Sequence, residues 1–315
     1  MRPTPPHGDL SKLKGNMISN ISFQFLKNIF RNLYFLMFLN GFLIASMFYF
    51  RMESTYENGL FASIKGSIDG SLDKDDTQDS IVVKAMATCH ELMSNRAPVF
   101  GGTRLLGLSA DFFHGTSVDL MTTQGACGSY AQVMAMILKT YDYPVRIAQM
   151  KAGGTWAAHN IVEVKTGHGW VVLDPTFNAH WITPAGRLAS FAEVHNDWKY
   201  YSRQVPANYD TQYRFEDVRY ANWTKVPVLM PAAKGILNMI LGKERADTIS
   251  IRTWFLKIYS IYFFVTLFLY IPVFLFTFRR LIQTKVFPNP DIPITIRNLI
   301  KYLRPIAGQS TEFTR

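Results

Sequence analysis

Cysteine is scarce in this chain of 315 residues, which contains only Cys89 and Cys127. Two thiols do not make the disulfide framework of a small secreted domain. They also fall short of a structural zinc site, which takes four ligands at fixed spacing. No calcium-loop pattern of the D-x-[DN]-x-[DN]-G type occurs either. We therefore expect no metal and no other cofactor, and each cysteine is interpreted on its own.

Charged side chains are also few, and they are unevenly placed. They make up 18% of the residues, compared with about 25% in an average soluble protein. The formal net charge is +10, but residues 1–31 carry five Lys or Arg and one Asp, and residues 279–315 carry seven Lys or Arg, one Asp and one Glu. The stretch between them has 21 basic and 20 acidic residues. Because the basic excess belongs to the two ends, no nucleic-acid partner is needed to explain it.

Two long runs contain no charged residue at all. They cover residues 32–50 and 258–278, which are nineteen and twenty-one residues long. At about 1.5 Å per residue, a helix of either length spans roughly 30 Å, the thickness of the hydrocarbon core of a bilayer. Basic residues flank both runs, as is typical of membrane-spanning helices, and Pro272 is compatible with such a helix. We predict two transmembrane helices in a lipid bilayer, the alternative being two buried helices of a soluble core.

The first run could instead be a signal peptide. Its apolar core is longer than the usual 7–15 residues or so, and Phe48, Tyr49 and Phe50 make a poor cleavage site. We therefore interpret it as an uncleaved anchor. The positive-inside rule then places both tails in the cytoplasm and residues 51–257 outside. This orientation depends mainly on the first run, because four basic residues also crowd the outer side of the second: Lys243, Arg245, Arg252 and Lys257.

The rest of the chain divides by composition. Residues 63–80 are rich in Gly, Ser and Asp, which is typical of a flexible tether. Residues 232–242 are apolar and favour a helix lying on the membrane surface. The expected organisation is a cytoplasmic tail at 1–31, a transmembrane helix at 32–50, a tether at 51–79, a core at 80–178, an accessory segment at 179–256, a transmembrane helix at 258–278 and a cytoplasmic tail at 279–315.

Within residues 80–178 the hydrophobic spacing predicts two helices followed by short strands. A helix beginning near Ser80 carries apolar residues at helical spacing, and we expect its Cys89 to pack in the core. A second helix begins near Cys127 and ends before Pro144. Strands are expected at 145–150, 159–164 and 169–174. We predict an α+β fold in which the helix bearing Cys127 packs on a small antiparallel sheet.

The last two strands are expected to form a hairpin that brings a carboxylate to a histidine. If residues 165–168 form the turn, counting back along both strands sets His159 opposite Asp174. Opposed residues have Cβ atoms about 4.5–5.5 Å apart, so the two side chains can hydrogen-bond. A slip of one residue would break this pairing. The same register pairs Val164 with Gly169 and Ile161 with Val172, and places Val162, Val164, Val171 and Leu173 on the other face.

Cys127 lies where a helix is expected to begin, between Gly125 and Gly128. A helix N-terminus presents unpaired N–H groups and a positive dipole end, which favour a thiolate. The same N–H groups can bind a developing oxyanion. We interpret Cys127 as a nucleophile, His159 as its base and Asp174 as the group that fixes the histidine tautomer. Gln124 and Trp156 are candidates for a second oxyanion donor or a substrate contact, although spacing fixes neither.

Three motifs carry a resemblance to a known family. They are QGACGSYA around Cys127, AAHNIVEV around His159 and GWVVLDPT around Asp174, with His159 32 residues after the cysteine and Asp174 a further 15 residues on. This order and spacing resemble the transglutaminase-like core of the papain-like cysteine protease superfamily, and YDYPVRIA resembles the family's link between the cysteine helix and the first strand. The resemblance covers about residues 80–178.

The resemblance implies acyl transfer through a thioester on Cys127. An amine acceptor would give crosslinking or transamidation, and water would give proteolysis or deamidation. The implied substrate is a protein or peptide, and a cell-envelope peptide would be reachable from the predicted side of the membrane.

Several alternatives stay open. QGACGSY also resembles the cysteine segment of papain proteases, but that alignment puts Tyr130 at the nucleophile position and requires a distant histidine. Cys127 could be a small core residue, His159 a satisfied core histidine and Asp174 a turn former before Pro175. An inactive relative would be a binding or scaffold module at the membrane. A transport role would require oligomerisation or a partner chain, because two helices are few for a pore and neither carries a charge.

Overall fold

The computed structural model describes residues 32–96, 115–121 and 126–283. Gln124, the N-terminal tail and residues 284–315 of the C-terminal tail lie outside these residues. The helices are α2 (Leu33–Asp69), α3 (Gln78–Ser94), α6 (Thr116–Met121), α7 (Cys127–Lys139), α8 (Phe191–Asn196), α9 (Trp198–Tyr201), α10 (Leu229–Leu241), α11 (Lys243–Asp247), the 3-10 helix η1 (Ile251–Phe255) and α12 (Ile258–Gln283). The strands are β1 (Val145–Ala152), β2 (Thr155–Thr166), β3 (Gly169–Asp174), β4 (Ala179–His180) and β5 (Asp217–Arg219).

The described residues group into two compact units, one holding 32–48 and 264–283 and the other 49–263. In the first unit, both α2 and α12 are long and apolar enough to cross a membrane. Phe268 is 76% exposed there, which argues against the alternative of a soluble core. Asn40 Nδ2 donates a hydrogen bond to Thr277 Oγ1 at 2.8 Å, a contact of the kind that joins helices in a bilayer.

Helix α2 does not end where its uncharged run ends but continues to Asp69. The prediction of a flexible tether at 51–79 is therefore wrong for residues 51–69, which are helical. The Gly, Ser and Asp residues that suggested flexibility lie on the exposed side of the helix, whereas Glu57, Phe61 and Ile68 form a buried stripe at helical spacing. Because Phe61 and Ile68 join the hydrophobic core of the second unit, this part of α2 is a packed element.

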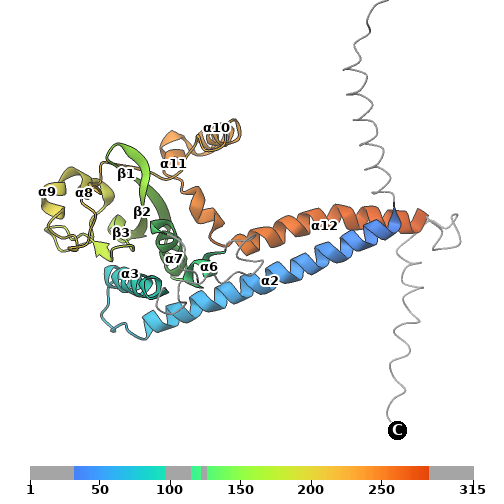
Figure 1. The fold of residues 1–315 in the computed structure, drawn as a ribbon, viewed down its shortest axis with the longest axis horizontal. Coiled ribbons are helices and arrows are strands. Elements are labelled where there is room, and N and C mark those ends of the chain that lie inside the picture. Colours follow the sequence, from blue (N-terminus) through green and yellow to red (C-terminus); the bar gives the residue numbers. More distant parts are fainter. Residues whose placement is uncertain (1–31, 97–114, 122–125, 284–315) are drawn as a thin grey trace, which may run out of the picture. The chain divides into compact units, whose positions relative to one another are not determined.

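The second unit is built around a five-stranded sheet in the order β4-β3-β2-β1-β5, in which every neighbouring pair is antiparallel. Figure 1 shows α7 alongside β1 and β2. The expected combination of a helix beginning at Cys127 with a small antiparallel sheet is confirmed. The two faces of the sheet carry separate hydrophobic cores.

One face of the sheet packs against helices, and the other packs against aromatic residues from later in the chain. On the first face, residues such as Val162 and Leu173 share a core with Met134 of α7 and Met86 of α3. The alternation of residues in the two hairpin strands predicts that Val162 and Leu173 share this face of the sheet. The second face is covered by the accessory segment, which contributes Trp181, Phe191, Tyr209 and Phe215 against Ile161 and Val172.

The hairpin of β2 and β3 differs in register from the expectation. Thr166 pairs with Gly169 and Val164 with Val171, so the turn contains only residues 167 and 168 rather than four. Two-residue turns are the commonest hairpin connections, because their twist matches that of the strands. The pairing is therefore displaced by two residues, and a displacement of two leaves every side chain on its predicted face.

The expected surface helix at 232–242 is observed as α10, three residues earlier at its start. None of its residues is buried, and Met239 and Ile240 are 81% and 66% exposed. Its placement on a membrane surface stays a prediction.

Candidate active site

Cys127 is the first residue of α7, as the sequence predicts. Ala126 precedes it and provides no side-chain cap. The N–H of Ser129 donates to the carbonyl of Ala126 at 3.0 Å, so the N–H groups of Cys127 and Gly128 are the first-turn donors that can bind an anion. The start of α7 is fixed by Ser129, whose hydroxyl donates a hydrogen bond to Asp119 Oδ1 at 2.7 Å inside the protein. Cys127 is half-buried, whereas Cys89 is fully buried in the core.

His159 and Asp174 meet in a fully buried hydrogen bond. The distance from His159 Nε2 to Asp174 Oδ2 is 2.6 Å, and the two side chains are 1% and 0% exposed. The second carboxylate oxygen accepts the backbone N–H of Thr176 at 3.1 Å. The imidazole also stacks on the ring of Tyr213, with centroids 4.4 Å apart and planes 12° apart. The imidazole plane is thus held from two sides, with Nε2 engaged by Asp174.

The observed register explains how these two residues still meet. The ladder pairs Val162 with Leu173, so Asp174 lies one step further, diagonal to His159 rather than directly opposite. Diagonal neighbours on one face are roughly 7–8 Å apart at Cα, which is within reach of an imidazole and a carboxylate. The predicted contact therefore forms although the predicted register is wrong, because the displacement keeps both residues on the same face.

The thiol of Cys127 has two polar neighbours from β2. Asn160 Nδ2 donates a hydrogen bond to Cys127 Sγ at 3.1 Å, and His159 lies close enough to the same sulfur to lower the pKa of the thiol. Burial raises the pKa of the Cys127 thiol, but the hydrogen bonds of His159 and Asn160 more than offset this, so the pKa lies below its ordinary value. The arrangement therefore favours a thiolate.

The pKa of His159 is shifted in the opposite direction, upward. Burial lowers the pKa of His159, but its hydrogen bonds with Asp174 and Cys127 outweigh burial and raise the pKa to about 9. A cysteine with a lowered pKa and a histidine with a raised pKa stabilise one another as a thiolate and an imidazolium. Chemically, such a pair supplies a nucleophile and an acid for the leaving group at neutral pH.

Two residues at this site were not predicted. Asn160 follows His159 directly, and the alternation of β2 that places Val162 against α7 would also have placed Asn160 there. Arg252 of η1 donates a hydrogen bond to Asn160 Oδ1. No local signal in the sequence could have found Arg252, because it is 92 residues away from Asn160 and was counted only among the basic residues before the second hydrophobic run.

Of the two candidates for an oxyanion donor or a substrate contact, Gln124 lies outside the described residues, and Trp156 lies on β2 opposite Lys151. The Trp156 ring faces the guanidinium of Arg219, with 4.9 Å between the Arg219 Cζ and the ring centroid. Within the described part of the chain, its indole N–H makes no hydrogen bond to Cys127. Trp156 instead lines a cavity of about 490 Å³ together with Arg219, Tyr220 and Trp223.

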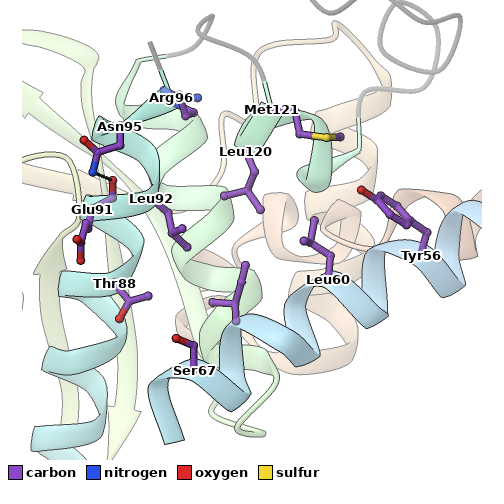
Figure 2. Close-up of a pocket in the computed structure, with 11 residues that line it drawn as sticks. Tyr56, Leu60, Ser67, Thr88, Glu91, Leu92, Asn95, Arg96, Leu120 and Met121 are labelled. Atoms are coloured by element: carbon purple, nitrogen blue, oxygen red, sulfur yellow. Dashed lines mark hydrogen bonds between the residues drawn. The ribbon is translucent and has the colours of Figure 1, made fainter. Parts of the chain in front are cut away.

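A second cavity, of about 560 Å³, lies between α2, α3 and α6 and is lined mainly by apolar side chains. Figure 2 shows Leu60, Leu92 and Leu120 around it, with Asn95 donating a hydrogen bond to the carbonyl of Glu91. None of its lining residues belongs to the group around Cys127. In the described ranges, no group of three or more His, Cys, Asp or Glu side chains is arranged to hold a metal ion.

Comparison with known protein families agrees with this geometry. Residues 111–175 match the model of the transglutaminase-like superfamily, and the match ends one residue after Asp174. Comparison with curated proteins gives no significant match, and comparison with solved structures gives none either. The mixed helix and antiparallel sheet architecture fits a transglutaminase-like core.

Proposed function

We propose that this chain is a membrane-anchored cysteine acyltransferase or hydrolase, which acts on amide bonds through a thioester intermediate. The observation that carries the proposal is the buried hydrogen bond between His159 and Asp174, next to the Cys127 thiol at the start of α7. The transglutaminase-like match supports the same chemistry. The two apolar helices support the membrane anchor.

In the proposed first half-reaction, Cys127 Sγ attacks the carbonyl carbon of a peptide or protein amide. The C–N bond breaks, and the leaving nitrogen takes its proton from His159. The N–H groups at the start of α7 stabilise the oxyanion of the tetrahedral intermediate. The product is a thioester on Cys127 and a free amine or ammonia.

In the second half-reaction, His159 removes a proton from the acceptor as the acceptor attacks the thioester carbon. The C–S bond then breaks and the thiolate returns. An amine acceptor gives a new amide, which is crosslinking or transamidation, and water gives hydrolysis or deamidation. Asp174 keeps His159 in one orientation throughout, and the same side chains serve either acceptor.

Thiol reactivity in the full-length protein, purified in detergent, tests this proposal. We expect iodoacetamide at pH 7 to alkylate Cys127 much faster than Cys89, which peptide mass spectrometry distinguishes. Cys89 is fully buried, and burial raises its thiol pKa. His159→Ala should slow alkylation of Cys127 by about tenfold or more, because the thiolate loses its partner.

His168→Ala is the matched control, since His168 lies exposed in the turn of the hairpin. It should leave the alkylation rate of Cys127 unchanged. Alkylation that is slow and indifferent to His159→Ala would overturn the enzymatic proposal, and it would favour an inactive module that binds a partner at the membrane.

A further inference from the structure

Two aromatic rings contact the imidazole of His159, and they meet it in different ways. Tyr213 of the accessory segment lies nearly parallel to it, with centroids 4.4 Å apart and planes 12° apart. Phe177, which follows Asp174 by three residues, meets it at 5.7 Å and is tilted by 54°. Of the two, Tyr213 is therefore the ring that turns its face, the negative part of an aromatic system, toward the imidazole.

Tyr213 is fixed in this position by the chain on both sides of it. Its backbone N–H donates to the carbonyl of Asp210 at 3.0 Å. Two residues later, Phe215 has a φ of 57°, a left-handed conformation that a bulky residue rarely adopts. The Phe215 side chain is fully buried and packs on Trp181 and Trp198 at ring-centroid distances of 4.7 and 5.5 Å. Because such strain persists only where packing imposes it, the aromatic layer fixes the backbone beside the stacked ring.

The charge of His159 depends on groups from several elements. Its imidazole is 1% exposed, and its partner in the ladder with β1 is the uncharged Met150. The titratable and charged groups that surround it are Cys127 of α7, Asp174 of β3, Arg252 of η1 through Asn160, and Tyr209 and Tyr213 of the accessory segment. Burial disfavours the imidazolium, but Asp174 and Cys127 favour it and raise the pKa of His159 to about 9. Tyr213 therefore stacks on a cation at neutral pH.

A stacked tyrosine ring can act on such a cation in two opposite ways. As a cover it keeps water from the imidazole, and loss of water destabilises the charged form. As a π-system it attracts a cation that lies within about 6 Å of the ring centroid, a condition that the 4.4 Å spacing meets. The two effects change the pKa of His159 in opposite directions, so the sign of a measured change distinguishes them.

We propose that Tyr213 is a positioning residue of the site, whose ring fixes the plane of the His159 imidazole and stabilises its cationic form beside Cys127. Tyr213 acts through His159, which carries out the proton transfer. This inference rests on the proposed function, in which the imidazolium gives its proton to the leaving nitrogen. The accessory segment is thereby part of the catalytic machinery as well as a cover for the sheet.

Titration of His159 by nuclear magnetic resonance tests the stacking without a substrate. The full-length protein in detergent carries ¹³C-labelled histidine, and Cys127→Ala removes the second titrating group of the pair, so that His159 titrates alone. The signal of His159 is identified among those of the seven histidines by its loss in His159→Gln.

In the Cys127→Ala parent, we expect Tyr213→Leu to lower the titration midpoint of His159 by about 0.5–1 pH unit, because leucine keeps the cover but lacks the π face. Tyr213→Phe keeps the face and should retain the parent midpoint. Tyr200→Leu is the matched control, at a half-buried tyrosine of the same segment whose ring packs on Tyr201 at 4.9 Å. It should leave the midpoint of His159 unchanged.

A midpoint that rises in Tyr213→Leu would overturn the proposal, because the ring would then act only as a cover. An unchanged midpoint, with a melting temperature near that of the parent, would overturn it as well. The proposed function would survive both results if alkylation of Cys127 by iodoacetamide still required His159. Conversely, a lowered midpoint in a protein whose alkylation is indifferent to His159 would support the stacking and reject the acyl-transfer chemistry.

Discussion

The charge of the Cys127 thiol depends on side chains that follow one another in β2. Asn160 hydrogen-bonds the sulfur, and His159 and Asn160 together lower the pKa of the thiol although burial acts in the opposite direction. Arg252 in turn holds the amide oxygen of Asn160, which leaves the amide nitrogen directed at the thiol. Asn160 therefore acts on the Cys127 thiol directly, and Arg252 acts on it through Asn160.

The first residue-scale prediction concerns pH. Because the pKa of Cys127 is lowered, its thiolate persists as pH falls, and the rate of iodoacetamide alkylation should decline only below that lowered pKa. In urea the same thiol should titrate near the ordinary value of about 8.5. The rates are measured from pH 5 to 10 in the native and the unfolded protein. Coincident profiles would contradict the prediction.

The second residue-scale prediction concerns the substitution Asp174→Asn. The carboxylate raises the pKa of His159, so its loss should destabilise the imidazolium and, with it, the thiolate. The midpoint of the alkylation profile should move to higher pH, and the rate at pH 6 should fall by roughly tenfold. Asp73→Asn changes an exposed turn residue and is the control. A slower rate without movement of the midpoint would indicate structural damage instead.

At the scale of elements, the later part of α2 is the clearest departure from the sequence-based expectation. Its composition suggests a tether, but Phe61 and Ile68 are buried at 0% and 1% exposure. Composition averages over all sides of a helix, whereas packing depends only on the side that faces the core.

We expect Phe61→Ala to lower the free energy of unfolding by about 3–5 kcal/mol, the usual cost of removing a buried phenylalanine. Met52→Ala, at a residue of the same helix that is 71% exposed, should change it by less than about 1 kcal/mol. Both are measured by denaturant unfolding in detergent. Equal effects of the two substitutions would mean that residues 51–69 do behave as a tether.

For the hairpin of β2 and β3, the sequence predicts the faces of the strands correctly but not their register. Alternating residues fix which side chains share a face, because the period of a strand is two. They do not fix how far one strand slides along the other, which the length of the turn decides. His159 and Asp174 were predicted to meet and do so in the structure, while the residues that pair across the ladder were predicted incorrectly.

For the whole molecule, the proposed topology follows from the two apolar helices and the charges around them. If both tails face the cytoplasm, residues 49–263 form an extracytoplasmic unit. We expect a membrane-impermeant maleimide to label Cys127 in intact cells and to leave buried Cys89 unlabelled. Cys127→Ala should abolish the labelling. Labelling that requires lysis would place the unit on the cytoplasmic side.

The sequence by itself determined the features that neighbouring residues encode. These are the two uncharged runs, the helix that begins at Cys127, the strands that carry His159 and Asp174, and the faces of those strands. Each depends on a short period in the chain, and a period is visible without the fold. The order of the three motifs was enough to suggest the transglutaminase-like resemblance that residues 111–175 confirm.

Only the tertiary structure decided which distant residues complete the site. Arg252 reaches Asn160 across 92 residues, and Tyr213 reaches His159 from the accessory segment. The accessory segment also becomes the aromatic layer on the second face of the sheet. Such contacts form because the chain closes long loops to bury apolar surface and to pair polar groups, and no local pattern records which partners that closure brings together.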